Sequence, residues 1–406
     1  MINSIESLKI SQKIADSICH QAIWYEGKCN WTGIYHNSQI ANTETVLRAL
    51  PSNFYVGSSG VAFFLSAIFN TLQDENYKKT ALGAWEKTIS QIPKIRLENI
   101  GFYEGLGGIA YTLVQSGKWL KSEKLISEGL QLIQKLANSF QDVGLDTMEG
   151  ISGFIIAASA IQREFPNEKF EDLIFAGGEH LLANAIKNKR GISWKILPTK
   201  GPNLTGYSQG NAGIVHALSE VYSISQDTKY LSIIEQAVAY ENSYYSEKYN
   251  NWKDLRQFHQ PHSRTRAGDA YNTNAWCQGA AGIGLSRLRT YQLTKQPFLL
   301  EDIAKASKKL LDKSFENNEI FSLCHGLLGD LYTLNTFNLF LKKNEISKKI
   351  EDGFDKITPM METLLFSDSK KHLLQNPSFM VGWAGIGYFF LSISLQKLPN
   401  VFIMGN

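Results

Sequence analysis

Two short motifs combine cysteine, histidine and glycine in a pattern that could bind a metal ion. Cys277 stands two residues before Gly279, and Cys324, which follows Cys277 by 47 residues, stands two residues before Gly326. His325 follows the second cysteine directly. Zinc prefers thiolate and imidazole ligands, and three protein ligands leave a fourth position open for a substrate, as in catalytic zinc sites. We therefore predict that Cys277, Cys324 and His325 bind zinc.

The glycine turn of these motifs recurs along the whole chain. The pattern Gly-x-x-Gly followed by apolar residues occurs seven times, with 45 to 69 residues between successive copies. Internal repeats of this length indicate a repeated structural unit. The apolar runs are hydrophobic nearly all round, which is typical of helices buried on every side. The seven copies begin at Gly57, Gly105, Gly150, Gly210, Gly279, Gly326 and Gly382.

Amphipathic segments separate the glycine turns, for example 122–133 and 300–311, and their pattern predicts outer helices with one face in water. We therefore predict an all-α fold, an α/α toroid in which seven inner and seven outer helices close a barrel within a single domain, 1–406. Residues 1–24 would form an N-terminal helical extension, and 257–273 a mobile loop before the first zinc cysteine. The turns should gather at one end of the barrel, where helix N-termini favour an anionic thiolate cluster.

Composition excludes several classes of protein. The 406 residues carry a formal net charge of only +3, which does not indicate a nucleic-acid partner. No apolar run reaches the roughly 18 residues of a membrane span, and the first residues lack a signal-peptide pattern. Four cysteines in a chain of this size do not form a disulfide framework, so we expect a cytoplasmic protein with free thiols and no stable membrane insertion. Cys19 and Cys29 lack glycine turns and are not predicted as ligands.

The motifs Trp276-Cys277-x-Gly279 and Leu323-Cys324-His325-Gly326, together with the seven glycine turns, resemble the lanthionine synthetase C-like cyclases. The resemblance covers roughly residues 25–404 and is closest to the C-terminal cyclase domain of class II lanthipeptide synthetases. It implies an enzyme in which zinc activates a peptide cysteine. The sulfur then adds to a dehydroalanine or dehydrobutyrine of the same peptide and closes a thioether ring. It also implies a dehydrated, cysteine-containing precursor peptide as substrate and a separate dehydratase as partner.

The resemblance assigns further site residues. Asp146, four residues before Gly150, matches the aspartate that relatives place near the nucleophile, although it could also cap the following helix. Gln209 occupies the position where relatives carry a histidine, and Gln278 a position that is often histidine or tyrosine.

Ring closure onto a dehydroamino acid produces an enolate that must receive a proton at its α-carbon. Gln209 can donate a hydrogen bond to the enolate oxygen but cannot deliver a proton at neutral pH. His259 and His262, in the predicted loop before Cys277, are candidate proton donors, and Tyr207 is another. Alternatively, water supplies the proton slowly, or the reaction is a different one.

Two other functions are compatible with the same motifs. The chain could be a zinc-bearing partner that holds a precursor peptide or braces a dehydratase without turnover. It could also add another thiol, such as glutathione, to an electrophile. Other α/α toroids are glycosidases, but those sites need paired carboxylates on the turns, where this chain has cysteines.

Overall fold

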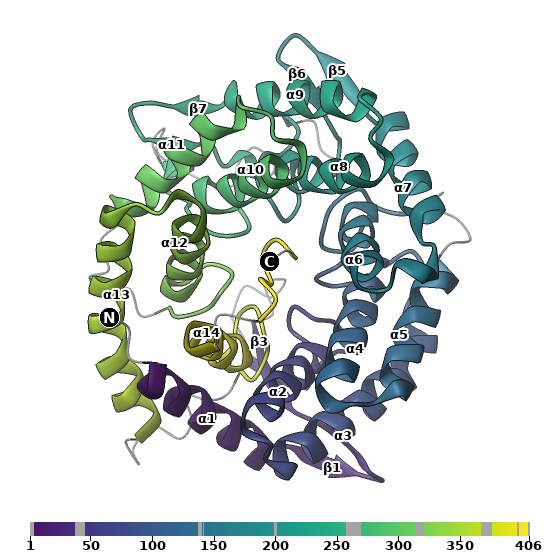
Figure 1. Ribbon diagram of the computed structural model, residues 1–406, viewed down its shortest axis with the longest axis vertical. Coiled ribbons are helices and arrows are strands. Elements are labelled where there is room, and N and C mark those ends of the chain that lie inside the picture. Colours follow the sequence, from purple (N-terminus) through teal and green to yellow (C-terminus); the bar gives the residue numbers. More distant parts are fainter. Residues whose placement is uncertain are drawn as a thin grey trace.

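The computed structural model describes residues 4–36, 45–136, 140, 142–198, 201–256, 269–312, 320–366, 376–395 and 398–404. Within these residues the chain forms fourteen α-helices, which Figure 1 shows as an inner ring surrounded by an outer one. This arrangement confirms the predicted α/α toroid.

Seven inner helices follow the seven glycine turns, and each begins at the residue after the first glycine. The second glycine of each turn meets the backbone closely; a Cβ atom at Gly282 would lie 1.9 Å from the carbonyl oxygen of Trp276. The chain can fold back so tightly only where the side chain is absent. The inner helices are α2 (Ser58–Leu72), α4 (Leu106–Leu120), α6 (Ile151–Glu164), α8 (Asn211–Ser225), α10 (Ala280–Thr294), α12 (Leu327–Leu341) and α14 (Trp383–Leu395).

Seven outer helices cover the inner ring. Six of them follow their inner partner in sequence. The seventh, α1, comes from the region predicted as an N-terminal extension and packs against α14, where the Ser11 hydroxyl donates to the Gly387 carbonyl at 2.9 Å. Since α14 also contacts α2, the ring closes on itself. The outer helices are α1 (Ser4–His20), α3 (Glu75–Gln91), α5 (Glu123–Lys135), α7 (Glu171–Ala183), α9 (Lys229–Asn242), α11 (Leu299–Leu311) and α13 (Asn344–Phe366).

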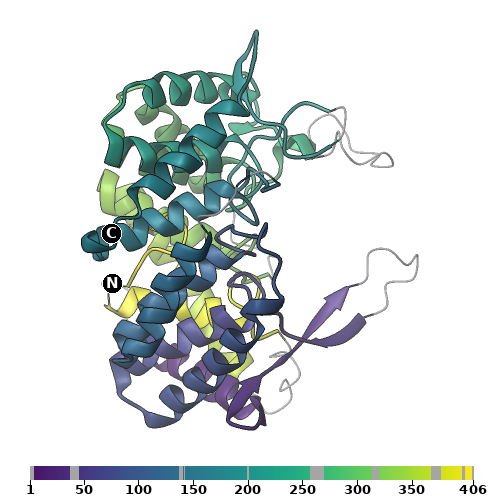
Figure 2. The ribbon, with the colours of Figure 1, turned by 90° about the vertical axis from the view of Figure 1, so that its right-hand side faces the viewer.

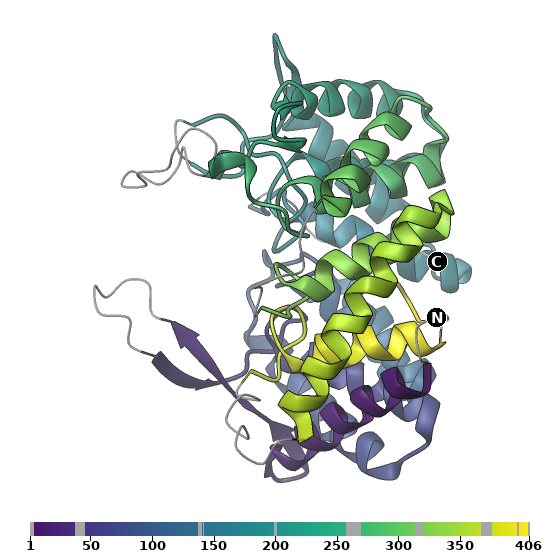
Figure 3. The same ribbon diagram turned by 90° about the vertical axis from the view of Figure 1, so that its left-hand side faces the viewer.

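Four two-stranded antiparallel hairpins interrupt the helical pattern, a feature that the all-α prediction did not include. Figures 2 and 3, which view the ring from opposite sides, show the pair β3–β4 extending away from the helices. Its register pairs Thr32 with Ala49 and His36 with Thr45. The hairpins are β1 (Ile23–Tyr25) with β2 (Lys28–Asn30), β3 (Thr32–His36) with β4 (Thr45–Ala49), β5 (Ile186–Asn188) with β6 (Gly191–Ser193), and β7 (Tyr245–Ser246) with β8 (Asn251–Trp252).

Backbone hydrogen bonds join the seven turns into a continuous circle at one end of the ring, which confirms the prediction that the turns gather there. Each turn donates an amide to the next turn, and the last donates to the first. The bonds run from Tyr55 N to Tyr103 O (2.8 Å), Phe102 N to Thr147 O (3.0 Å), Thr147 N to Ser208 O (3.2 Å), Tyr207 N to Cys277 O (3.0 Å), Trp276 N to Cys324 O (3.0 Å), Cys324 N to Met380 O (2.9 Å) and Met380 N to Tyr55 O (2.9 Å).

The segment 398–404, which we call the lumenal segment, enters the space inside the ring (Figure 1). Its last four residues, Val401 to Met404, are buried. Of the described helices, none combines the length and the apolar character that crossing a bilayer requires.

Candidate active site

The two predicted cysteine ligands lie on adjacent turns of the circle. Cys277 precedes the start of α10 by three residues, and Cys324 precedes the start of α12 by three residues. Their thiols lie close enough for each to shift the pKa of the other. Cys324 is buried, whereas Cys277 is half-buried and therefore more accessible to solvent.

The two thiols differ in acidity. The neighbouring Cys324 thiol lowers the pKa of Cys277, and the positive charge of Arg256 adds to the effect, although burial opposes it. The Cys277 thiol, together with burial, raises the pKa of Cys324 well above its ordinary value. Of the two thiols, Cys277 is therefore the more readily deprotonated.

His325 lies on the same turn as Cys324, with an exposed side chain. Partial burial lowers the pKa of the imidazole, and Arg256 contributes further, so the neutral form that binds metals is favoured. Among the described residues, however, no group of three or more His, Cys, Asp or Glu side chains is arranged to hold a metal ion. Thiol and imidazole groups are nevertheless the donor types that zinc prefers, and His325 directly follows Cys324 in the chain.

Arg256 is a site residue that the sequence analysis did not identify as functional. It forms an ion pair with Asp254 (10% exposed), with Arg256 Nη2 2.7 Å from Asp254 Oδ2. The Arg256 side chain is nevertheless 39% exposed, and its charge acts on both cysteines and on His325. Arg256 therefore provides a positive charge beside the thiol pair.

Tyr55, on the first turn, is a second residue that the sequence analysis missed. Its half-buried side chain lies close enough to Cys324 to lower the pKa of that thiol, which opposes the rise caused by Cys277 and by burial. Burial raises the pKa of Tyr55 above its ordinary value, and the nearby cysteines act in the same direction, so the phenol keeps its proton. No local motif marks Tyr55, because only closure of the ring brings the first turn to the sixth.

Gln209 and Tyr207 share the fourth turn but face different surroundings. Gln209 is half-buried, whereas Tyr207 is fully buried, and the Tyr207 hydroxyl lies 2.7 Å from Nδ1 of His216. A buried phenol with this partner is poorly placed to meet a substrate. Tyr207 instead supports the site through its backbone, because its amide donates to the Cys277 carbonyl at 3.0 Å.

Asp146 shapes the third turn. Its Oδ1 accepts the backbone amides of Met148 at 2.8 Å and Glu149 at 3.0 Å, just before α6 begins. Burial raises the pKa of Asp146, although these amide hydrogen bonds oppose the rise. Burial raises the pKa of Glu104, and the charges of Glu149 and Asp146 add to the rise. The three carboxyl groups therefore lie near one another at the end of the ring where the turns gather.

The two histidines predicted as alternative proton donors, His259 and His262, lie outside the described residues. Of the predicted loop 257–273, the structure describes the part from residue 269, where Asp269–Tyr271 forms a short 3₁₀ helix.

Comparisons with known proteins agree with this architecture. The model of the family described as lanthionine synthetase C-like protein matches residues 48–403. The lacticin 481/lactococcin biosynthesis protein LcnDR2 of Lactococcus lactis subsp. lactis is 26% identical over 343 residues, covering 79% of this chain and 33% of that protein. This chain thus spans about a third of the length of that relative. Among solved structures, nisin cyclase is 17% identical with a TM-score of 0.67, over 87% of this chain and 92% of that chain, which shows a shared fold.

Proposed function

The chain belongs to the lanthionine synthetase C-like family, and on that premise we propose that it is a peptide cyclase that closes thioether rings. The observation that carries the proposal is the closeness of the Cys277 and Cys324 thiols, which lie on adjacent turns of the circle. The substrate would be a dehydrated precursor peptide that carries a cysteine. A dehydratase activity would supply it, since the proposed reaction consumes dehydroamino acids.

We propose Cys277, Cys324 and His325 as the residues that hold zinc. Bound zinc would deprotonate the substrate thiol and keep its sulfur nucleophilic at neutral pH. Two protein thiolates and one neutral imidazole supply two negative charges, and these would limit how strongly the substrate sulfur is held. The positive charge of Arg256 would favour the thiolate form of the pair.

The reaction adds the elements of a thiol across a carbon–carbon double bond. A bond forms between sulfur and the β-carbon, the π electrons pass to the α-carbon and its carbonyl, and the proton lost from sulfur is balanced by one gained at the α-carbon. The mass of the peptide is therefore unchanged. In this proposal Gln209 donates a hydrogen bond to the enolate oxygen, and Asp146 shapes the turn beside it.

The group that protonates the α-carbon is a separate part of the proposal. Tyr55 carries its proton next to the thiol pair, so we add it to the candidates His259 and His262. Its position at the first turn places it across the circle from Gln209, so the two side chains could approach a bound dehydroamino acid from different directions.

The test is conversion of a synthetic peptide that contains one cysteine and one dehydroamino acid. We expect purified protein with zinc to give a product of equal mass that iodoacetamide no longer alkylates. The Cys324→Ala variant should leave the peptide alkylatable. Unchanged alkylation with the wild-type protein after prolonged incubation, using several peptide sequences, would contradict the proposed activity.

A second function is favoured by one observation, the presence of Gln209 on the fourth turn where a proton-transferring side chain is expected. The chain would then bind a precursor peptide or brace a dehydratase without turnover. The Gln209→His variant separates the two proposals. Ring closure by that variant alone would identify the natural protein as a binding partner.

A further inference from the structure

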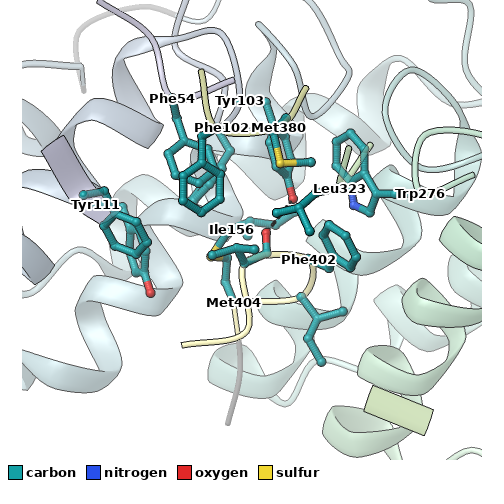
Figure 4. Close-up of a cluster of buried hydrophobic side chains, with 14 of the residues drawn as sticks. Phe54, Phe102, Tyr103, Tyr111, Ile156, Trp276, Leu323, Met380, Phe402 and Met404 are labelled. Atoms are coloured by element: carbon teal, nitrogen blue, oxygen red, sulfur yellow. Dashed lines mark hydrogen bonds between the residues drawn. The ribbon is translucent and has the colours of Figure 1, made fainter. Parts of the chain in front are cut away.

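The lumenal segment lies directly beneath the cysteine turns. Figure 4 shows Phe402 beside Trp276, with Met404 deeper inside the ring. The Phe402 ring stacks on the Trp276 ring at a centroid distance of 6.0 Å and an interplanar angle of 25°. The Phe402 ring also packs edge-on against the Tyr332 ring, with the two ring centroids 4.9 Å apart. Phe402 is therefore fixed between an inner helix and the Cys277 turn.

Tyr103 fastens both the lumenal segment and the tryptophan. Its hydroxyl donates to the carbonyl of Val401 at 3.1 Å, and its ring packs against Trp276 at 4.4 Å. Trp276 is thus held from two directions by aromatic rings, and its own side chain is buried. A ring in such a packed setting has little freedom to change its orientation.

Trp276 connects this packing to both thiols. It precedes Cys277 in the chain, and its backbone amide donates to the Cys324 carbonyl at 3.0 Å. A shift of the indole that also moves the Trp276 backbone would therefore change the placement of one cysteine turn relative to the other. The separation of two ligands must be held closely for them to act together on one atom.

A second chain of contacts runs from the lumenal segment to the same turn. Arg163 Nη2 donates to the Met404 carbonyl at 2.9 Å and also pairs with Glu220. The remaining contacts join Glu220 to His216 (3.3 Å), His216 to the Tyr207 hydroxyl (2.7 Å) and the Tyr207 amide to the Cys277 carbonyl (3.0 Å).

We propose that Phe402 is a positioning residue for the Cys277–Cys324 pair, acting through Trp276. The proposal rests on the site assigned under the proposed function, since it concerns the same two thiols. It requires neither bound zinc nor catalytic turnover, because the packing holds the thiols as a pair in the metal-free protein.

Phenylarsine oxide tests this directly, because its arsenic bridges two neighbouring thiols with loss of water. The assay uses metal-free protein in which Cys19 and Cys29 are replaced by alanine, so that two of the four cysteines remain. We expect one arsenical retained per chain and none after Cys324→Ala. Phe402→Ala should weaken retention by about tenfold or more, as loss of ligand-orienting groups does at metal sites. Phe402→Tyr should restore most of it, since the ring is kept.

Phe354→Ala is the matched control, because Phe354 is also a buried phenylalanine stacked on an aromatic ring, that of Phe389, but lies on α13. Both alanine variants should lower the unfolding temperature, and only Phe402→Ala should weaken retention. Equal retention in Phe402→Ala and wild type, or equal losses in both alanine variants, would overturn the proposal. Absence of retention in the metal-free parent would also overturn it, since the thiols would not be held as a pair. The outcome is independent of the peptide assay, so failure of cyclase activity would be seen separately.

Discussion

The backbone amide of Trp276 donates to the carbonyl oxygen of Cys324 at 3.0 Å, which ties the two cysteine turns to one another. This bond is one of seven that close the circle of turns. The two cysteines therefore lie on turns that belong to a continuous circle of backbone hydrogen bonds. A displacement of one turn should also displace the turns that are bonded to it.

Zinc content tests the proposed ligands. Purified wild-type protein should contain about one zinc ion per chain, and Cys324→Ala should lose it, because tetrahedral sites need at least three protein ligands. His325→Ala should lose it as well, because that change also leaves only two of the three proposed ligands. Metal analysis after dialysis gives the result. Absence of zinc in wild-type protein purified with zinc would count against all three ligands.

Tyr55→Phe removes the hydroxyl that lies near Cys324 while keeping the ring. If Tyr55 delivers the proton to the α-carbon, ring closure should slow by about 100-fold, the lower end for a positioned acid. Tyr25→Phe is the control, because Tyr25 lies on β1 with its side chain exposed. Equal rates in single-turnover assays of Tyr55→Phe and Tyr25→Phe would exclude the role.

Gly282→Ala should destabilise the fold, because the added Cβ atom would lie 1.9 Å from the Trp276 carbonyl oxygen. Relieving that overlap requires the Cys277 turn to move, and we expect a loss of about 2–4 kcal/mol in the free energy of unfolding. At Gly144 the nearest atom to an added Cβ is 3.7 Å away, so Gly144→Ala should be nearly neutral. Urea unfolding of the two variants measures the difference.

Arg287→Met should lower the free energy of unfolding, because it removes the cation of a buried charge network. Arg287 pairs with Glu241 at 2.8 Å and with Asp302 at 2.9 Å, and all three side chains are buried. Removing the cation leaves two buried carboxylates unpaired, a loss of about 3–5 kcal/mol at neutral pH. The pKa of Glu241 is already raised by burial and should rise further, so acidification toward pH 5 should recover part of the loss.

A similar or larger loss at pH 5 would contradict this reading of Arg287→Met. As an exposed reference, Lys124→Met removes the ion pair with Glu86, and both of these side chains are exposed. Its stability should stay close to wild type, because solvent screens exposed pairs.

Lys87 should make the free energy of unfolding change with pH in the alkaline range. Burial lowers its pKa to about 8, while its amine donates to the Leu50 carbonyl at 3.1 Å. Because the unfolded lysine titrates near 10.4, the unfolded state binds more protons between these values, and stability should rise with pH across that interval. Lys87→Met should flatten the rise. Denaturant titrations at pH 7.5, 8.5 and 9.5 would show it, and parallel profiles for both proteins would refute it.

The sequence by itself determined the repeated unit of this protein. A glycine that must approach the backbone, followed by a run that is apolar on all sides, is a local signal, and all seven inner helices begin where it occurs. The same signal placed Cys277 and Cys324 on equivalent turns. Their partnership was predictable because adjacent repeats of a toroid are also neighbours in space.

Only the tertiary structure decided which distant residues meet those thiols. Tyr55 lies near Cys324 because the seventh turn bonds back to the first, and Phe402 of the lumenal segment stacks on Trp276 although the two are distant in the chain. The small hairpins and the packing of α1 against α14 were likewise not predicted from the sequence. The physical reason is that periodicity reports which face of an element is buried, whereas the identity of its partner depends on how the whole ring closes.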